Sequence, residues 1–414
     1  MGKKKAASSE KKASAESMSL HDGEHVRMDC WHGLLPNEDT GGLLKNDGDF
    51  LMRGLEQNGV YHVLLSVRSG KDVLNSAIVE GKQGGFVFKG DHFETIKDII
   101  DFYQVRKRPL VISGVPTTLE TPVRRKAWEL RHRMVTLGKE LGAGSYGTVY
   151  KGTLQMERGK PMEVAVKVLT EMSAEASNAL WKEARNHQTF DHPNVVKLYG
   201  VANDFLPYYL VMELVSGGSV DNYLTKKGKK LDVRARTQIL IEAATGLDYL
   251  HSKDCLHRDI ACRNLLIDSV ADFGMSRRST AYKIDPNKPM NLRWLAPEVY
   301  KTAMVHKSTD IYAFGVTMYE CFTLPYAIPY GDWPPNKAGG RGPPTSSLLC
   351  LQVYEEVVNR GYRLEPPKMM PRMIADLMAE CLGPEPERPS FKTVVVCLRS
   401  FMKNGNTNRG LGVF

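Results

Sequence analysis

The stretch that decides the fold of this chain is His257-Arg258-Asp259-Ile260-Ala261-Cys262-Arg263-Asn264, and Asp272-Phe273-Gly274 follows it. Chance could produce one of these motifs, but it is very unlikely to produce both in this order. Carboxylate and amide oxygens suit a hard cation, so Mg²⁺ is the expected metal if these side chains hold one. The two motifs therefore predict a catalytic, metal-binding site.

A glycine-rich stretch lies upstream and reads Leu141-Gly142-Ala143-Gly144-Ser145-Tyr146-Gly147-Thr148-Val149. Glycines let backbone N–H groups approach phosphates because no Cβ stands in the way. Alone this is a weak signal, and an ordinary turn would explain it. Here Val164-Ala165-Val166-Lys167 follows with the alternation of a strand, and Glu183 lies beyond it in a helical stretch. This order favours a nucleotide site over a surface Lys–Glu pair, which would contribute little.

Together the motifs resemble those of protein kinases, in which G-x-G-x-x-G-x-V, V-A-I-K, H-R-D-x-x-x-x-N, D-F-G and A-P-E follow one another. The resemblance implies that Lys167 contacts the α- and β-phosphates of ATP and pairs with Glu183. It implies that Asp259 accepts or orients the proton of the substrate hydroxyl. It also implies that Asn264 and Asp272 hold two Mg²⁺ ions, while His257 is expected to brace the loop.

The same resemblance implies which residues surround ATP. The stretch 209–215 resembles the hinge strand under the adenine, with Met212 guarding the inner pocket and the backbones of Glu213 and Val215 bonding the base. An ordinary buried strand end is the alternative for this stretch. The residues expected to bind ATP are Leu141, Gly142, Ala143, Gly144, Gly147, Val149, Ala165, Lys167, Met212, Glu213 and Val215.

Details of the catalytic stretch are similar to tyrosine kinases. Serine/threonine kinases usually carry Lys where this chain has Ala261, and tyrosine kinases place Arg before the Asn, as Arg263 does here. Removal of the lysine opens space for a phenol, which reaches further from its backbone than serine does. Arg293-Trp294 before Ala296-Pro297-Glu298 is a second such mark. The resemblance therefore implies transfer of phosphate from ATP to tyrosine-containing protein substrates, with Arg263 among the catalytic residues.

Tyr282 lies between D-F-G and A-P-E, where activation-loop tyrosines of kinases sit, so the resemblance makes it a regulatory phosphosite. A phosphate there would add up to about two negative charges and pair with Arg258 and with Arg277 or Arg278. An unmodified surface tyrosine is the alternative. The family pattern also makes Arg388 the expected partner of Glu298.

The segment after Asn264 departs from the kinase pattern. Asp272 follows Asn264 by only eight positions, which is shorter than usual in the family. The missing piece is a hairpin that carries the D-F-G aspartate to the metal. This shortening leaves a second hypothesis open, in which the chain is a catalytically weak pseudokinase that acts as a phosphotyrosine-binding scaffold.

The N-terminal half contains a second resemblance. Trp31-His32-Gly33, followed by Gly48-Asp49-Phe50-Leu51-Met52-Arg53, is similar to an SH2 domain, where W-x-H-G opens the fold and F-L-V-R ends the second strand. The resemblance implies an antiparallel sheet flanked by two helices. It also implies that Arg53 is buried and binds phosphotyrosine bidentately, a geometry that lysine cannot copy. An arginine that caps a surface strand is the alternative.

Three positions around this arginine differ from the SH2 pattern. Asn37 stands where the family often has Arg, Leu55 where a phosphate-binding Ser is common, and Asn75 near the usual His. A reduced or altered phosphopeptide affinity is therefore expected. The order of the two domains resembles cytoplasmic tyrosine kinases of the Fes/Fer group, without that group's long N-terminal membrane-bending region.

Composition places the chain among soluble globular proteins. It has 414 residues, 42% of them hydrophobic and 25% charged, and a net charge of +9 that favours acidic partners. No motif for nucleic acid is present, and no apolar run approaches the roughly 18 residues that span a bilayer. Seven cysteines without a C-x-x-C pair indicate reduced thiols and a cytoplasmic location.

The expected organisation is α+β, with a bilobal kinase domain after the SH2 domain. The N-terminus begins Met1-Gly2 and continues with clustered lysines, which would allow lipidation and peripheral membrane contact. Ala6 stands where that signal expects Ser or Thr, and this favours a solvated tail or an import signal. The expected segments are a basic disordered tail (1–28), an SH2 domain (29–115), a linker (116–133), a tyrosine kinase domain (134–404) and a C-terminal tail (405–414).

Overall fold

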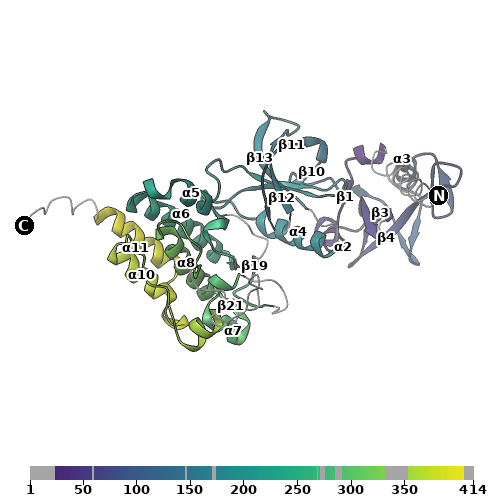
Figure 1. Ribbon diagram of the computed structural model, residues 1–414. Coiled ribbons are helices and arrows are strands. Elements are labelled where there is room, and N and C mark those ends of the chain that lie inside the picture. Colours follow the sequence, from purple (N-terminus) through teal and green to yellow (C-terminus); the bar gives the residue numbers. More distant parts are fainter. Residues whose placement is uncertain are drawn as a thin grey trace, which may run out of the picture. The chain divides into compact units, whose positions relative to one another are not determined.

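The computed structural model describes residues 24–57, 60–144, 147–169, 174–267, 269–270, 276–284, 291–331 and 353–404. The chain divides into two compact units. Unit 1 comprises residues up to Trp181 together with Tyr199–Met212, and unit 2 comprises Lys182–Leu198 together with the chain from Glu213 onward. Figure 1 labels the elements of both units, and each unit is described by itself below. The predicted tails at both ends fall almost wholly outside the described residues.

Unit 1 begins with a sheet in the strand order β1-β2-β3-β4-β5-β6, to which β9 adds beside β2. The strands are β1 (Trp31–Leu34), β2 (Asp49–Gln57), β3 (Val60–Ser69), β4 (Asp72–Glu80), β5 (Phe86–Phe88), β6 (Asp91–Phe93) and β9 (Thr121–Pro122), and a separate pair is formed by β7 (Leu110–Ile112) and β8 (Val115–Thr117). The β2–β3–β4 ladders are antiparallel, whereas β1 and β9 run parallel to β2. The expected antiparallel sheet is therefore present in β2–β3–β4, but the strands that pair with the other side of β2 are parallel to it.

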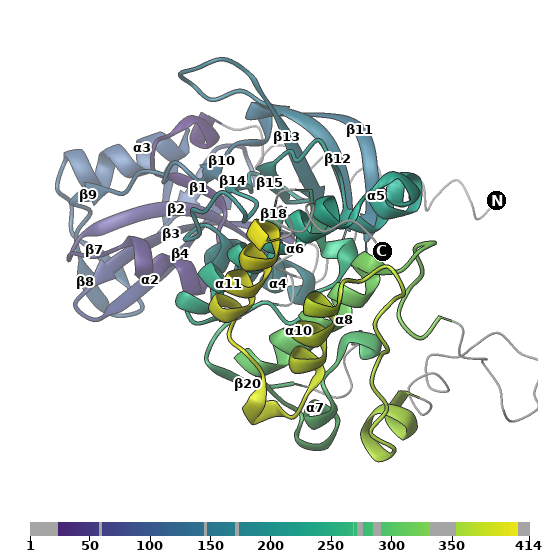
Figure 2. The same ribbon diagram turned by 90° about the vertical axis from the view of Figure 1, so that its left-hand side faces the viewer.

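Two helices accompany this sheet, α2 (Asn37–Leu43) and α3 (Ile96–Ile100), and a π-helical turn over Asp101–Val105 extends α3. Figure 2 shows α3 above and α2 below the strands. Thr95 begins α3 because its hydroxyl accepts the Asp98 N–H while the Asp98 carboxylate accepts the Thr95 N–H. Ile96, Ile99 and Ile100 then face a core shared with the sheet strands.

A second sheet in unit 1 has the order β10-β14-β15-β13-β12-β11. Its strands are β10 (Glu129–Leu130), β11 (Val135–Gly144), β12 (Gly147–Leu154), β13 (Met162–Val168), β14 (Leu198–Ala202) and β15 (Tyr209–Glu213). Helix α4 (Ala174–His187) carries Trp181, whose fully buried ring packs edge-on against Trp128 and Tyr208. The stretch 116–133, expected as a linker, contributes β9 to the first sheet and β10 to the second.

Unit 2 is mostly helical. Its longer helices are α5 (Val220–Lys227), α6 (Val233–Ser252), α7 (Pro297–Thr302), α8 (Lys307–Phe322), α10 (Arg372–Leu382) and α11 (Phe391–Asn404). Three short strand pairs join them, β16 (Cys255–Leu256) with β19 (Arg277–Arg278), β17 (Leu265–Leu266) with β18 (Ser269–Val270), and β20 (Ala281–Lys283) with β21 (Met304–His306). The expected mixture of helices and sheet is confirmed.

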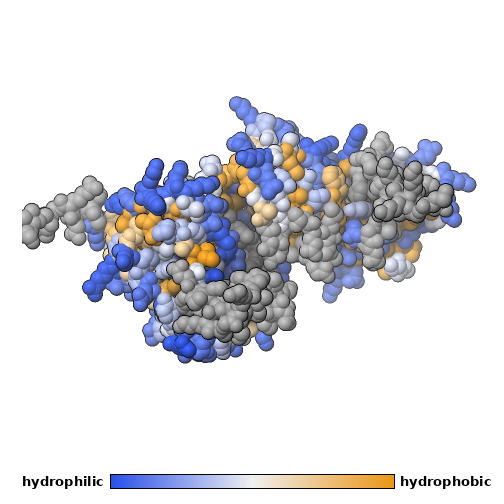
Figure 3. Space-filling model, in the orientation of Figure 1, coloured by the Kyte–Doolittle hydropathy of each residue, from blue (hydrophilic) through white to orange (hydrophobic). Residues whose placement is uncertain are grey.

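Helix α8 is the centre of the unit 2 core, because nearly all of its side chains are buried. Asp232 begins α6 by accepting the Ala235 N–H. The surface over α5 is mainly hydrophilic (Figure 3), and the lysines at the end of this helix are exposed. Within the described residues, no helix combines the length and the apolar character needed to cross a bilayer.

Candidate active site

The carboxylate of Asp259 is the centre of the candidate active site, and it accepts three side-chain hydrogen bonds. Arg263 donates to its Oδ1 at 2.5 Å, and Asn291 donates to the same oxygen at 2.5 Å. Asn264 donates to Oδ2 at 2.7 Å and also to the Asp259 carbonyl at 2.7 Å. Asp259 and its loop partners Arg263 and Asn264 therefore lie together, while Asn291 is a contact that sequence reasoning missed.

The loop backbone before Asp259 is held by Asp310, which is buried in α8. Its two carboxylate oxygens accept the N–H groups of His257 at 2.8 Å and Arg258 at 2.9 Å. Arg258 has a φ of 70°, a conformation that costs free energy for a residue with a side chain. Burial would raise the pKa of Asp310, but its hydrogen bond and charge interaction with His251 outweigh burial and lower it. Asp310 thus stays ionised and fixes the loop.

His257 has the bracing role expected from the sequence. Its side chain is fully buried, and its Nδ1 accepts the backbone N–H of Asp259 at 3.3 Å. This bond lies within the loop itself, next to the turn that Asp310 holds. It ties the residue that carries the carboxylate to the buried part of unit 2.

A second buried carboxylate, Glu320, supports the loop from α8, and no motif in the sequence predicts its role. It accepts the Trp294 indole N–H at 2.7 Å, the Cys262 N–H at 3.2 Å and the Tyr326 hydroxyl at 2.9 Å. Burial raises the pKa of Glu320 to about 7, against the lowering effect of these donors. The Trp294 ring in turn lies 4.4 Å from the guanidinium of Arg263.

The glycine-rich strands and Lys167 are neighbours in the second sheet of unit 1. Antiparallel pairing places Gly144 opposite Gly147, and Val149 opposite Lys167. Gly147 has a φ of 151°, and a Cβ there would overlap the carbonyl oxygen of Val168, so glycine is required. Lys167 is buried at 9% exposure, which suits a lysine that holds an anion more than a solvated one.

One backbone hydrogen bond limits which atom of Glu213 could bond an adenine at the predicted hinge. The N–H of Glu213 donates to the Lys197 carbonyl at 2.9 Å, and the Glu213 carboxylate accepts the Lys197 N–H at 3.2 Å. Glu213 would therefore contribute its carbonyl, and not its N–H, to an adenine. Met212 and Val215 are half-buried.

Of the two predicted metal ligands, Asn264 and Asp272, the structure describes Asn264. Both amide hydrogens of Asn264 point at Asp259, so the amide oxygen is the atom that would face a metal. Asp272 lies outside the described residues, as do Phe273 and Gly274. Among the described residues, no group of three or more His, Cys, Asp or Glu side chains is arranged to hold a metal. The shortened segment nevertheless closes a hairpin, because Leu265 pairs with Val270 and Leu266 with Ser269.

The segment after the catalytic loop includes Tyr282, the predicted phosphosite. Tyr282 lies in β20 opposite Val305, with the Arg258 guanidinium 4.2 Å from its ring centroid.

The predicted Glu298–Arg388 pair is confirmed. It is bidentate, with N–O distances of 2.6 and 2.9 Å. A further predicted site residue, Glu183, which is expected to pair with Lys167, is buried at 7% exposure.

In the N-terminal block, Arg53 is fully buried in β2 and its donors are all directed at neutral oxygens. Its Nε donates to the Ser66 hydroxyl at 2.9 Å, and one terminal nitrogen donates to the Leu35 carbonyl at 2.9 Å. The other donates to the side-chain oxygens of Asn37 and, at 3.0 Å, Asn75. Burial lowers the pKa of Arg53 to about 10, because these contacts include no carboxylate.

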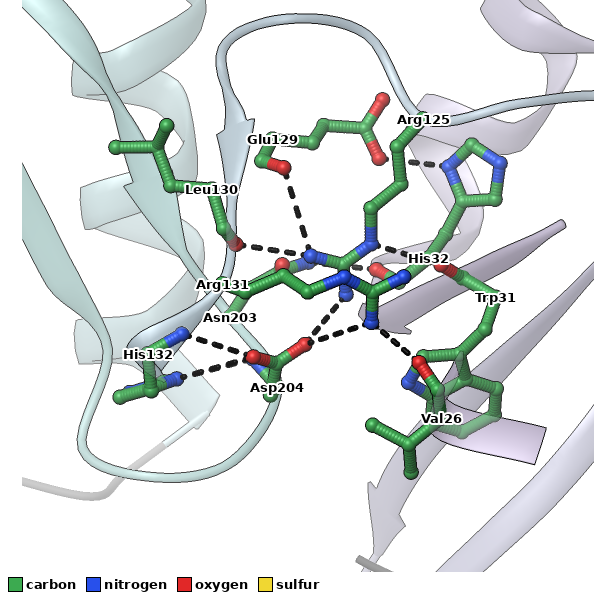
Figure 4. A network of polar contacts seen from close by, with 10 residues as sticks. All are labelled: Val26, Trp31, His32, Arg125, Glu129, Leu130, Arg131, His132, Asn203 and Asp204. Atoms are coloured by element: carbon green, nitrogen blue, oxygen red, sulfur yellow. Dashed lines mark hydrogen bonds and ion pairs between the residues drawn. The ribbon is translucent and has the colours of Figure 1, made fainter. Parts of the chain in front are cut away.

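A buried polar network lies between the two sheets of unit 1 (Figure 4). Arg125 donates to the Trp31 carbonyl at 2.7 Å, to the Leu130 carbonyl at 2.8 Å and to the Asp204 carboxylate at 2.7 Å. His32 bonds the Glu129 carboxylate at 2.6 Å. The residues drawn come from the first sheet and the 3₁₀ turn before it, from the connecting stretch and from the β14–β15 loop. The connecting stretch therefore holds two parts of unit 1 together.

Comparison with known proteins shows the family to which the chain is similar. The family described as "Protein tyrosine and serine/threonine kinase" matches residues 135–398. "Tyrosine-protein kinase Fer" of Homo sapiens is 32% identical over 388 residues, which is 92% of this chain and 44% of that protein. "Fer-related kinase 1" of Caenorhabditis elegans is 31% identical over 387 residues, which is 90% of this chain and 94% of that protein.

A viral relative adds to the pattern. "Tyrosine-protein kinase transforming protein Fps" of avian sarcoma virus (strain PRCII) is 33% identical over 376 residues, 88% of this chain and 66% of that protein. The chain thus spans less than half of human Fer, about two thirds of the viral protein and nearly all of the worm kinase. The chain belongs to the protein tyrosine and serine/threonine kinase family.

Proposed function

We propose that this chain transfers the γ-phosphate of ATP to tyrosine hydroxyls of protein substrates. The observation that carries the proposal is the Asp259 carboxylate, which is oriented by Arg263 and Asn264 on a loop whose backbone Asp310 fixes. A carboxylate held in one orientation can accept or orient the proton of a hydroxyl as it attacks phosphorus. Positioning of this kind is the main task of a protein in phosphoryl transfer.

Tyrosine is the favoured substrate because of what lies beside Asp259. Ala261 is buried and small, so no long side chain from that position enters the space next to the carboxylate. Arg263 takes the place beside Asp259 and is itself stacked on Trp294. Space bounded by a flat cation and an aromatic ring suits a phenol more than the short side chain of serine. The relatives named above are tyrosine kinases by name.

ATP and Mg²⁺ are the expected cofactors. Bound Mg²⁺ would neutralise charge on the β- and γ-phosphates. The amide oxygen of Asn264 fits a hard cation, and Asp272 is the expected second ligand. Lys167 and the glycine-rich strands of β11 and β12 would hold the phosphates, and buried Glu183 is the expected partner of Lys167.

The decisive experiment compares Asp259→Asn with the unchanged chain, using ATP, Mg²⁺ and a peptide with one tyrosine. We expect a loss of roughly 10²- to 10⁴-fold in kcat, as for removal of a general base. Asp254→Asn is the matched control, because the Asp254 side chain is exposed in the same unit and forms a surface ion pair of 2.7 Å with Lys307. Equal activity in the chain and in Asp259→Asn would refute the proposal. A serine version of the peptide should react far more slowly.

The scaffold hypothesis gains no support from the described hairpin. It rested on the short segment after Asn264, and β17 and β18 pair there in spite of the shortening. The return strand ends at Val270, two residues before Asp272.

We further propose that the N-terminal block is an SH2 domain that binds phosphotyrosine peptides through Arg53. The support is a fully buried guanidinium without a counter-ion among its hydrogen-bond partners, a state that costs free energy unless an anion arrives. A phosphate would replace the two Asn oxygens, and the amides could then rotate to donate their N–H groups. The pocket would offer one cation and two neutral amides.

The test is binding of a phosphotyrosine peptide and its unphosphorylated version. Arg53→Lys should lose at least about tenfold in affinity for the phosphopeptide, because lysine cannot bind bidentately. Arg68→Lys is the matched control, since the Arg68 side chain on β3 bonds only the exposed Gly70 carbonyl, at 2.9 Å. Equal affinity for both peptides would refute phosphotyrosine recognition.

A further inference from the structure

Asn291 contacts the catalytic carboxylate from a distant point of the sequence. Its amide donates to Asp259 Oδ1 at 2.5 Å across 32 residues. The Asn291 backbone is held at the start of a 3₁₀ turn over Leu292–Trp294, where its carbonyl accepts the Trp294 N–H at 3.1 Å. Asn291 and Asp259 also line the same cavity of about 40 Å³. The contact therefore occupies an oxygen of the carboxylate that is proposed above to receive the substrate hydroxyl.

The acceptor capacity of Asp259 is nearly used. A carboxylate offers about four lone-pair positions, two on each oxygen. Oδ1 already accepts from Arg263 and Asn291, and Oδ2 accepts from Asn264. The position left on Oδ2 is beside Asn264, the expected metal ligand. A hydroxyl that is to donate to Oδ1 must therefore displace one of the two donors there.

The two donors on Oδ1 differ in how firmly they are held. Arg263 carries a full charge and is stacked on Trp294, which is anchored to buried Glu320. Asn291 is neutral and exposed, and it lies outside the catalytic loop. A hydrogen bond from a neutral amide is weaker than one from a guanidinium to the same carboxylate. Asn291 is thus the donor that an incoming hydroxyl displaces.

We propose that Asn291 is a positioning residue that sets the affinity for the substrate tyrosine by competing with its hydroxyl for Asp259 Oδ1. The proposal rests on the tyrosine phosphotransfer proposed above. The competition acts on ligands that carry the hydroxyl, and a phenylalanine peptide does not need the Oδ1 position. The signature of this role is therefore a change in the ratio of affinities for tyrosine and phenylalanine peptides.

The test is Asn291→Ala, with kcat and KM measured for the tyrosine peptide and Kd for the tyrosine and phenylalanine peptides. We expect KM and Kd for the tyrosine peptide to fall roughly three- to tenfold, the worth of one hydrogen bond. The phenylalanine peptide should bind as before, kcat should stay within about twofold, and KM for ATP should not change. Asn291→Ser, which keeps a small polar residue at the start of the turn, should behave in the same way.

Asn359→Ala is the matched control, because Asn359 is an exposed amide in the same unit that donates to the Glu355 carboxylate at 2.7 Å. Three results would overturn the proposal. These are an unchanged tyrosine-peptide affinity, an equal gain for both peptides, or a fall in kcat at constant KM. If the unchanged chain has no kinase activity, the proposed function fails, and the two peptide affinities still decide the role of Asn291.

Discussion

Replacement of Asp204 by alanine is expected to destabilise unit 1 strongly, because it removes the carboxylate that joins Arg125 to His132 in the network of Figure 4. One oxygen of Asp204 accepts from Arg125 at 2.7 Å, and the other accepts the His132 N–H at 2.8 Å. The side chains of Asp204 and Arg125 are each only 9% exposed. Alanine would leave a buried guanidinium without its counter-ion and a buried N–H without its acceptor.

The magnitude follows from two arguments. Removal of one partner from a buried ion pair typically costs about 3–5 kcal/mol, because the remaining charge stays desolvated. The pKa of Asp204 gives a second figure, for the charge of this residue alone. Burial would raise that pKa, but hydrogen bonds from His132 and the charge of Arg125 outweigh burial and lower it to about 2. A shift of this size corresponds to about 2.4 kcal/mol in favour of the ionised carboxylate.

The sign of the pH dependence follows from the same shift. Since the folded-state pKa lies below the ordinary value of 3.8, the stabilisation is fully present above about pH 4 and is lost as the pH falls toward 2. Asp204→Ala should remove this part of the acid sensitivity, in addition to lowering the free energy of unfolding. The stability of Asp204→Asn should lie between that of the unchanged chain and that of Asp204→Ala. One of the two donors, Arg125 or the His132 N–H, then faces the amide NH₂ of asparagine instead of an acceptor oxygen.

The assay is urea unfolding followed by tryptophan fluorescence, since Trp31, Trp128 and Trp181 all lie in unit 1. Asp29→Ala is the matched control, because its pair with Arg124 is 3.2 Å long but 70–79% exposed and should contribute less than about 1 kcal/mol. If Asp204→Ala loses no more stability than Asp29→Ala, the reasoning about burial is wrong. An unchanged acid transition would contradict the pKa argument separately.

Three further outcomes are expected. Because burial raises the pKa of Glu320 from 4.5 to about 7, the stability of unit 2 should fall by up to about 3 kcal/mol as the pH rises from 4.5 through 7, and Glu320→Gln should flatten this slope in pH-dependent unfolding. Gly147→Ala should weaken nucleotide binding by tenfold or more in a calorimetric titration, because a Cβ would overlap the Val168 carbonyl at a φ of 151°. Gly41→Ala, in helix α2 with no atom near its Cβ and no positive φ, should not. Arg388→Ala should lower the free energy of unfolding of unit 2 by about 3 kcal/mol, since the side chain is 2% exposed and bonds Glu298 bidentately, and a loss under 1 kcal/mol would contradict this.

The parts of the site that could be predicted are those fixed by short-range pattern. The pairing of Val149 with Lys167 follows from two alternating strands that are consecutive in the chain, and the Asp259 contacts with Arg263 and Asn264 follow from spacings of four and five residues. Family resemblance added the Glu298–Arg388 pair, which spans 90 residues. Each of these depends on a motif that can be seen in the chain itself.

The parts that could not be predicted depend on tertiary packing. Nothing in the sequence around Asn291 or Glu320 points toward the catalytic loop, because Asn291 lies 32 residues from Asp259 and Glu320 lies 58 residues from Cys262. These contacts are set by how α8 and the 3₁₀ turn pack. The stretch 116–133 reads as a linker because it is rich in Pro and basic residues. Its Arg125 is nevertheless buried, which is possible only because three oxygens from separate segments converge on it.

The two arginines of the catalytic loop are held in different ways, and this bears on what a phosphate on Tyr282 would do. The backbone of Arg258 is fixed by Asp310, while its guanidinium rests on the Tyr282 ring. The guanidinium of Arg263 is instead fixed between Asp259 and Trp294. A phosphate on Tyr282 would exchange the ring contact of Arg258 for an ion pair. Because Asp310 holds the backbone and Arg263 holds the carboxylate, that exchange would reorganise the segment around Tyr282 without moving Asp259, so phosphorylation should act on access to the site more than on the geometry of its base.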